Sequence, residues 1–267
     1  MSRASWVPGV WVFEWSDAVT STNDVAKERA RSDAPSGLVV GARRQTGGRG
    51  RGGHTWTSPE GGLYCSIVLR DIPPEVAPLL PLATTVALAE AIDRFALLLR
   101  VWVKWPNDLL VGAVDAERPE GKAAGVLVES ASEGARVTWA VVGLGLDLAV
   151  PEVALPATEP PARSLVQYDP DVPHTEQFMA TFLDRFGAML DVAALDPQAI
   201  IRLAERRLAY RGEPVVVVVE ASENKPARFV EGTLDGLEPD GRLRLDTPAG
   251  PVRFAAWEAS ALRPSAP

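Results

Sequence analysis

The spacing of hydrophobic residues predicts the first half of the chain. After TST at 20–22, a polar stretch of helix-forming residues predicts a capped helix that ends near Asp33. GLVVGARR and LYCSIVLR are apolar and rich in β-branched residues, so they predict two strands joined by a glycine-rich loop. From Leu79 to Leu99, apolar residues at helical spacing predict one long helix.

The middle of the chain alternates short apolar runs with turns. VWVKW, DLLVG, GKAAGVLVES and RVTWAVVGLGLDL predict four strands, and PND at 106–108 predicts a turn between the first two. The proline-rich stretch 150–173 has little periodicity and is expected to pass over the surface. TEQFMATFLDRFGAMLDV and DPQAIIRLAERRLA then predict two helices.

The pattern changes at Tyr210 to short strands separated by DG and PAG turns. The apolar stretches of this tail are VVVVVE, ARFVEGTLDGLEPDGRLRLDT and GPVRFAAWEASALRP. They predict a small β-barrel, so we expect two domains, residues 1–208 and residues 209–267.

Composition and charge narrow the class of protein. The chain is 46% hydrophobic and 23% charged, which is ordinary for a globular protein, and its net charge of −8 disfavours nucleic acids and anionic membranes as partners. Cys65 is the one cysteine of the sequence, so no internal disulfide can form, and we find no export signal or uncharged membrane span. We expect a cytoplasmic protein that binds neither DNA nor membrane.

The candidate chemistry centres on residues 45–56, QTGGRGRGGHTW. Glycines let backbone N–H groups approach an anion, and arginine forks bind phosphate oxygens, so the loop is typical of an anion clamp. A solvated hairpin and an RGG-type contact with single-stranded RNA are the alternatives.

Other phosphate-binding and hydrolytic motifs are incomplete. EGK at 120–122 lacks the first glycine and the Ser or Thr of a P-loop, and GLGLDL at 143–148 lacks the third glycine of a dinucleotide fingerprint. No GxSxG motif occurs, and two histidines with one cysteine do not favour a zinc or cysteine enzyme.

Five segments in chain order resemble the catalytic domain of the biotin protein ligases. They are TSTND, QTGGRGRGGHTW, VKWPNDLLV, GKAAGVLVES and GLGLDL. The resemblance covers about the first three quarters of the chain, and the β-rich tail is similar to the SH3-like domain of that family. It implies an α+β fold: a mixed, largely antiparallel sheet with helices on one face, related to class II synthetases and lipoate ligases, plus a small C-terminal SH3-like β-barrel. Residues 1–208 would be the catalytic domain, and residues 209–267 the SH3-like domain.

The resemblance also implies a reaction. Biotin and ATP, with Mg²⁺, would form biotinyl-adenylate, which would then acylate one lysine of a biotin carboxyl carrier protein. A lipoate or octanoyl ligase or transferase of related fold is the alternative within the enzymes, and an RGG-type RNA-binding module is the alternative from a different class. The sequence leaves the oligomeric state open, with a homodimer among the options. It begins close to the motifs, leaving no room for the winged-helix domain of some relatives, so no repressor function is expected.

Candidate site residues follow from the matching motifs. The catalytic candidates are Arg49, Lys122 and Asp108. The biotin-binding candidates are Ser21, Thr22, Asn23, Gln45, Arg49, Gly50, Arg51, Lys122 and Gly125. The ATP-binding candidates are Arg49, Arg51, Trp56, Lys104, Asn107 and Asp147. No metal ligand is assigned, because Mg²⁺ is expected to be held by the ATP phosphates.

Some of these roles are specific and others stay open. By resemblance, Arg49 and Lys122 would hold the biotin carboxylate and the α-phosphate, and Trp56 would stack on adenine, with a hydrophobic anchor for the loop as its alternative. Asp108 would either help to hold Mg²⁺ or orient the incoming lysine. The loop itself is expected to be poorly ordered without ligand.

Three features depart from the family pattern. Asp147 stands where asparagine is common, and His54 where basic residues are usual. The turn GAVDAERPEG before Lys122 is long, so the strand register around this lysine is not fixed by the sequence.

Overall fold

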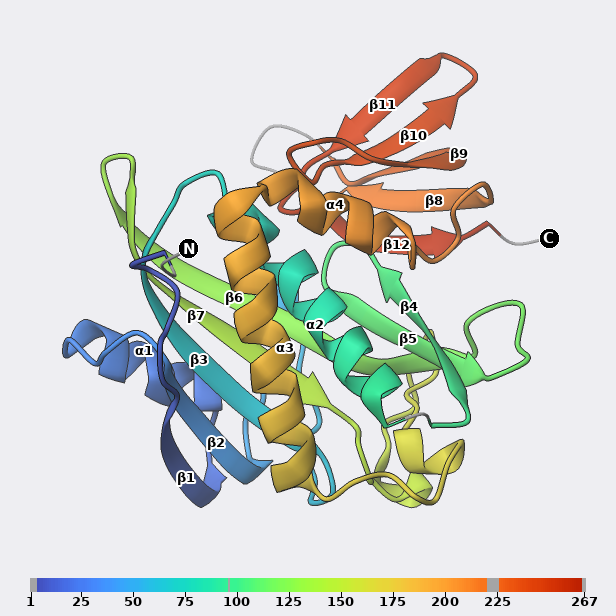
Figure 1. Cartoon of the computed structure of the whole chain (residues 1–267). Coiled ribbons are helices and arrows are strands. Elements are labelled where there is room, and N and C mark those ends of the chain that lie inside the picture. Colours follow the sequence, from blue (N-terminus) through green and yellow to red (C-terminus); the bar gives the residue numbers. More distant parts are fainter. Residues whose placement is uncertain (1–3, 96, 220–225, 266–267) are drawn as a thin grey trace.

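The structure is a computed structural model that describes residues 4–95, 97–219 and 226–265 (Figure 1). The predicted elements occur in the predicted order, after one strand over Val12–Val19 that the sequence analysis missed. Seven strands form the first sheet: β1 Val12–Val19, β2 Leu38–Gln45, β3 Leu63–Ile72, β4 Leu99–Lys104, β5 Asp108–Ala113, β6 Gly121–Glu133 and β7 Arg136–Leu146. The helices are α1 Thr22–Arg31, α2 Leu80–Arg94, α3 Thr175–Leu195 and α4 Pro197–Glu205. The second sheet contains β8 Pro214–Val219, β9 Arg228–Leu237, β10 Leu243–Thr247, β11 Gly250–Phe254 and β12 Ala259–Pro264. Of the helices in the described ranges, none has the length and apolar composition that crossing a membrane requires.

The first sheet is mixed, as predicted. Its strand order is β1-β2-β3-β7-β6-β5-β4, with β1 and β2 parallel and the other neighbours antiparallel. A parallel pair needs a crossover connection, and α1 supplies it between β1 and β2. The α+β fold class is therefore confirmed.

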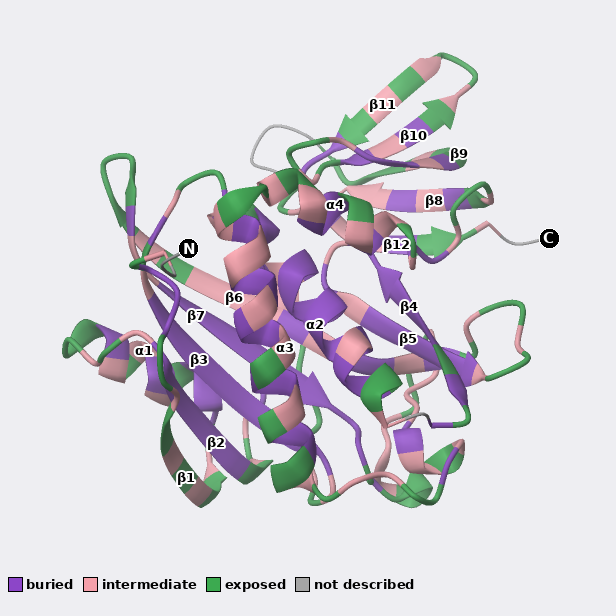
Figure 2. Cartoon of the chain, in the orientation of Figure 1, coloured by how far each residue is buried: buried purple, intermediate pink, exposed green. Residues whose placement is uncertain are grey.

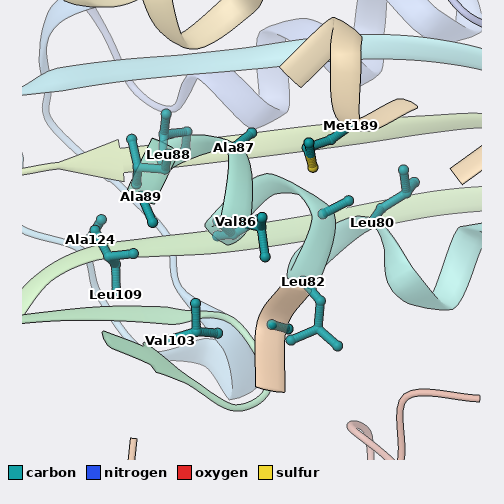
Figure 3. Close-up of a cluster of buried hydrophobic side chains, with 14 of the residues drawn as sticks. Leu80, Leu82, Val86, Ala87, Leu88, Ala89, Val103, Leu109, Ala124 and Met189 are labelled. Carbon is teal, nitrogen blue, oxygen red and sulfur yellow. The ribbon is translucent and has the colours of Figure 1, made fainter. Parts of the chain in front are cut away.

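The two faces of this sheet are covered differently. The main core lies between the sheet and α2, α3 and α4, where buried side chains of α2 meet Val103, Leu109 and Ala124 of the sheet and Met189 of α3 (Figures 2 and 3). On the opposite face, α1 packs Ala26 and Ala30 against a small separate cluster that contains Val40, Val68 and Val141. The prediction of helices on one face thus holds for α2, α3 and α4, and α1 is the exception.

The predicted long helix over 79–99 is wrong at its C-terminal end. Helix α2 ends at Arg94, and Leu99 already belongs to β4. Exposure alternates between Leu97, Leu98 and Leu99, at 9%, 62% and 8%, which is the period of a strand. In a short apolar run, the sequence alone does not distinguish the period of a helix from that of a strand.

The connection 150–173 does not lie wholly on the surface, and for its later part the prediction is wrong. Ser164 and Leu165 are fully buried. The carbonyl of Pro161 accepts a hydrogen bond from the backbone N–H of Lys122 at 2.8 Å, and the N–H of Leu165 donates to the carbonyl of Asp147 at 3.0 Å. The segment therefore fixes the backbone of two candidate site residues.

The C-terminal strands form an antiparallel sheet of order β11-β10-β9-β8-β12, consistent with the predicted SH3-like unit. This sheet shares the main core, and two side chains, from the turn after β4 and from the end of α4, tie it to the rest of the fold. Trp105 donates its indole N–H to the carbonyl of Gly241 at 2.9 Å, and Glu205 accepts from the N–H of Leu237 at 2.9 Å. The domain boundary at 208/209 itself stays a prediction.

Replacing Trp105 should measure how much its contact with Gly241 contributes to the stability of the fold. Trp105 is 1% exposed, so Trp105→Phe removes buried volume and leaves the Gly241 carbonyl without its donor, and we expect a loss of about 2–3 kcal/mol of unfolding free energy in urea titrations. Trp257→Phe is the matched control, because Trp257 is 80% exposed. Equal stability of the two variants would show that Trp105 does not hold the sheets together.

Candidate active site

Glycines form the floor of the site on the face that α1 partly covers. Gly125 pairs with Gly145 across β6 and β7, and Gly143 lies two residues before Gly145 on the same face. A Cβ on Gly143 would lie 1.9 Å from the Asn23 amide oxygen, and one on Gly145 would lie 2.4 Å from the Trp56 indole nitrogen. The glycines therefore let side chains from α1 and the loop lie directly on the sheet.

The start of α1 supplies a polar wall. Thr22 donates its N–H to the Gln45 amide oxygen at 2.8 Å, and Ser66 bonds to the Thr22 hydroxyl at 2.8 Å and donates to the Asn23 amide oxygen at 2.6 Å. Ser21 occupies the N-cap position, but its side chain makes no capping bond. These buried hydroxyl and amide groups are held in fixed orientations next to the cavity.

A β-bulge brings Lys122 to the same face as Gly125. In a regular strand, residues three apart point to opposite faces. The register between β5 and β6 shifts by one residue, so that Leu110 faces Lys122 while Leu109 faces Ala124. Ala123 and Ala124 both enter the core, and the Lys122 amine lies 3.4 Å from the Cβ position of Gly125. The register that the sequence left open is thus set by this bulge.

Asp108 holds two ammonium groups. Its carboxylate oxygens lie 2.7 Å from the Lys122 amine and 3.6 Å from the Lys104 amine. Lys104 is 8% exposed, and burial lowers the pKa of Lys104, with the repulsion of Lys122 adding to this and the attraction of Asp108 opposing it. The arrangement keeps two cations together at the edge of the cavity.

Trp56 covers the glycine floor. Its ring lies over Gly145, is 3.2 Å from the Cβ position of Gly125, and has the Lys122 amine 5.3 Å from a ring centroid, within the range of a cation–π contact. Its indole nitrogen is buried without a hydrogen-bond partner among the described residues. An uncompensated buried donor favours a ring that shifts when a ligand offers an acceptor.

Arg49 is held by acidic residues of other elements. Its guanidinium donates to Glu129 and lies 3.1 Å from Asp24, while Glu129 also accepts from Lys27 and Asn23. Burial raises the pKa of the Glu129 carboxyl, but the three hydrogen bonds outweigh it and lower the pKa overall. Glu129 is therefore an ionised anchor for this arginine.

Arg51 bridges three parts of the fold. It donates to the amide oxygen of Asn107 at 3.1 Å, to the carbonyl of Ala259 at 2.8 Å, and to the carbonyl of Ala256. The loop is thereby tied both to the turn after β4 and to the C-terminal sheet.

Two adjoining cavities collect most of the predicted residues. The inner cavity, of about 160 Å³, is lined by Ser21, Thr22, Asn23, Gln45, Arg49, Gly50, Arg51, Trp56, Asn107, Asp108, Lys122 and Gly125. The side cavity, of about 290 Å³, is lined by Lys104 and Asp147, with His54, Trp56, Asp108 and Lys122 common to both. The inner cavity is smaller than most ligand sites because Trp56 lies in it.

Asp147 lies deep in the side cavity. It is 3% exposed, and its Oδ1 atom has no hydrogen-bond partner within the described part of the chain. Burial raises the pKa of Asp147 to about 7, although the nearby Lys122 charge opposes the shift. The neighbouring Tyr64 phenol is also buried, and its burial, with the charge of Asp147 adding to the effect, raises the pKa of Tyr64.

Sequence reasoning missed several residues of the site. Ser66 anchors Thr22 and Asn23, Glu129 anchors Arg49, and Ser260 of the C-terminal sheet lines both cavities. A polar Ser66 inside the apolar run LYCSIVLR was the one visible signal. Among the described residues, no group of three or more His, Cys, Asp or Glu could hold a metal ion.

Comparison with known proteins gives a consistent result. A model of the biotin/lipoate A/B protein ligase family matches residues 15–147. The chain is 33% identical to a biotin--[acetyl-CoA-carboxylase] ligase of Paracoccus denitrificans, over 86% of this chain and 92% of that protein. It is 30% identical to the bifunctional ligase/repressor BirA of Bacillus spizizenii, over 88% of this chain and 70% of that protein.

The fold comparison points the same way. The structure of a biotin protein ligase from Aquifex aeolicus in complex with biotin and ATP superposes with a TM-score of 0.76 and 26% identity, covering 95% of this chain and 99% of the other.

The Asp147 carboxyl makes stability depend on pH. Because its pKa in the folded protein is raised from 3.8 to about 7, the folded state keeps a proton that the unfolded state releases, so stability falls as pH rises between these values, by up to about 4 kcal/mol. Asp147→Asn removes this loss, and the variant should gain stability over the native protein between pH 5 and pH 8 in urea unfolding. Asp17→Asn, at a side chain 95% exposed, is the control. Parallel pH profiles of the native protein and Asp147→Asn would refute the assignment.

Proposed function

Because the chain belongs to the biotin protein ligase family, we propose that the site described above carries out both half-reactions of biotin ligation. The protein is an ATP-dependent ligase that activates biotin as biotinyl-adenylate and transfers it to a carrier protein. The similarity to biotin ligases over most of the chain disfavours the lipoate and RNA-binding alternatives. The residue roles below are our proposal.

One observation carries the assignment of the two substrates. A neutral polar wall of Thr22, Asn23 and Gln45 and a cationic wall of Lys104 and Lys122 meet at the inner and side cavities. The first suits the amide-like ureido ring of biotin, and the second suits the phosphates of ATP. Biotin held by its ring at the first wall would direct its carboxylate toward a phosphate bound at the second.

The first step brings two anions together. The biotin carboxylate attacks the α-phosphorus of ATP, and pyrophosphate leaves with the electrons of the broken P–O bond. Lys122, at the border of both cavities, is positioned to offset charge on the carboxylate and the α-phosphate at once. Arg49 would join it by leaving Glu129 and Asp24. The arginine would exchange these two carboxylates for the biotin carboxylate and the α-phosphate.

Trp56 has to move for biotin to bind over Gly125. Its ring now rests on the glycine floor that the biotin rings are proposed to use. Displaced from there, it remains on the border of the side cavity, where stacking on adenine is open to it. This reconciles the predicted role of Trp56 with its position in the structure.

The second step needs a free amine. The lysine of the carrier attacks the carbonyl carbon of the adenylate, and AMP leaves. Asp108 is the carboxylate closest to Lys122 and is our candidate for orienting the amine. Mg²⁺ is proposed to enter on the triphosphate and offset its charge, because no described cluster of acidic residues could hold it alone.

The remaining partner and location assignments are also proposals. A biotin carboxyl carrier domain is the protein substrate, and net charge of −8 supports the absence of DNA binding. The single, buried Cys65 supports a cytoplasmic location. Exposed Val12, Phe13 and Trp15 on the edge strand β1 support a homodimer, which sedimentation at two protein concentrations would test.

The adenylation step predicts biotin-dependent exchange of labelled pyrophosphate into ATP with Mg²⁺. Arg49→Ala and Lys122→Ala should each lower the rate about 100-fold or more, because each removes a cation from the transition state. Arg43→Ala is the control, since its side chain is 65% exposed and lines neither cavity. Exchange that lipoate supports as well as biotin does, or that survives both substitutions, would overturn the proposal.

Loop closure predicts protection from protease. Arg49 and Arg51 offer trypsin sites in a glycine-rich segment, and biotin with ATP should slow cleavage there at least about tenfold by ordering the loop. Mass spectrometry of the fragments would locate the cuts. Equal cleavage with and without ligands would contradict the prediction that the ligands order the loop.

A further inference from the structure

Trp257 is an exposed aromatic ring close to the loop. It follows β11 in the connector to β12 and is 80% exposed. Together with residues 49–54, Leu127 and Glu129 it lines an outer hollow of about 410 Å³. This hollow adjoins the inner cavity, since Leu127 and Arg49 line both. An exposed tryptophan adds nothing to the core, and such rings are enriched where proteins bind one another.

The backbone on either side of the ring is tied to the loop. Arg51 bonds to the carbonyls of Ala256 and Ala259, on either side of Trp257. The same arginine belongs to the loop and reaches Asn107 of the catalytic domain. The connector is therefore held against the loop while Arg51 makes these bonds, and the ring lies beside the loop.

The chemistry of the hollow suits a lysine-bearing protein segment. Glu129 lines the hollow and, like Asp24, pairs with Arg49. When Arg49 turns to the ligand, as proposed above, these carboxylates lose that partner and attract a cationic side chain. The exposed Trp257 ring offers an apolar anchor in the same hollow. By contrast, Lys104 and Asp147 line the side cavity and do not line the outer hollow.

We propose that Trp257 and the outer hollow form the docking surface for the carrier domain, with the acceptor lysine passing Arg49 and Leu127 to reach the inner cavity. This inference rests on the proposed function, because it assumes that biotinyl-adenylate lies in the inner cavity. The docked lysine ammonium first loses a proton to solvent. The free amine then forms a C–N bond to the adenylate carbonyl, the C–O bond to AMP breaks, and the second proton of the amine also goes to solvent. Trp257 touches none of the reacting atoms and acts by binding the partner.

The test compares three activities of Trp257→Ala. Transfer to the unbiotinylated carrier domain of an acetyl-CoA carboxylase should show a KM raised about tenfold or more, as expected for an aromatic anchor at an interface. Pyrophosphate exchange should stay within about twofold of the native rate. Formation of biotin hydroxamate with hydroxylamine, which needs no docking, should also stay within about twofold.

Two further variants sharpen the result. Trp257→Phe should recover most of the affinity for the carrier, because it keeps an aromatic ring. Phe229→Ala is the matched control, since Phe229 is 71% exposed on the same small sheet but lines none of the three cavities. Its carrier KM should equal that of the native protein.

Each other outcome has a defined meaning. An unchanged carrier KM in Trp257→Ala would overturn the docking surface. A parallel fall in exchange, hydroxamate formation and transfer would also overturn it, because Trp257 would then act on the loop. Absence of biotin-dependent exchange in the native protein would remove the proposed function itself, and this inference with it.

Discussion

The carboxylate of Asp108 between the amines of Lys104 and Lys122 is the interaction on which the site depends. Two ammonium groups at the edge of a cavity repel each other and lose hydration, and a carboxylate 2.7 Å from one and 3.6 Å from the other offsets both costs. The cations can therefore be in place before any phosphate arrives. Their positions are set by backbone features: the turn that precedes Asp108, the bulge beside Lys122, and the Pro161 carbonyl that accepts from the Lys122 N–H.

The two arginines of the glycine-rich loop are likewise held by oxygen atoms of other elements. Arg49 pairs with Glu129 and Asp24, and Arg51 binds carbonyl and amide oxygens, so neither guanidinium depends on solvent alone in the ligand-free protein. A bound anion gains the charge of Arg49 only after the arginine gives up these partners. Arg49 therefore adds less binding free energy than an unpaired cation would. The exchange favours ligands whose geometry binds the guanidinium better than the carboxylates of Glu129 and Asp24 do.

The sequence predicted elements and motifs well, and long-range contacts poorly. Spacing and turn residues were enough for β2 to β7, α3, α4 and the C-terminal strands, because these signals are local. The partners of the motif residues were not predictable: Glu129 lies 80 residues from Arg49, and Ala259 lies 208 residues from Arg51. Nor does alternation place Lys122 and Gly125 on one face, since only the bulge does that. The C-terminal end of α2 was predicted wrongly for a similar reason, because one apolar stretch continues from the helix into the strand β4.

Burial also decides what Asp147 does to the charge of the side cavity. An ionised Asp147 together with Asp108 would cancel the charges of Lys104 and Lys122 and leave little attraction for a triphosphate. Burial raises the pKa of Asp147 to about 7, so below that pH the carboxyl is largely neutral and does not cancel a lysine charge. A neutral carboxyl has one O–H donor and one carbonyl acceptor, so in hydrogen bonding it resembles the asparagine side chain more than a carboxylate does. The departure from the motif is therefore smaller in the folded protein than in the sequence, because burial makes the folded protein retain a proton on this side chain below about pH 7.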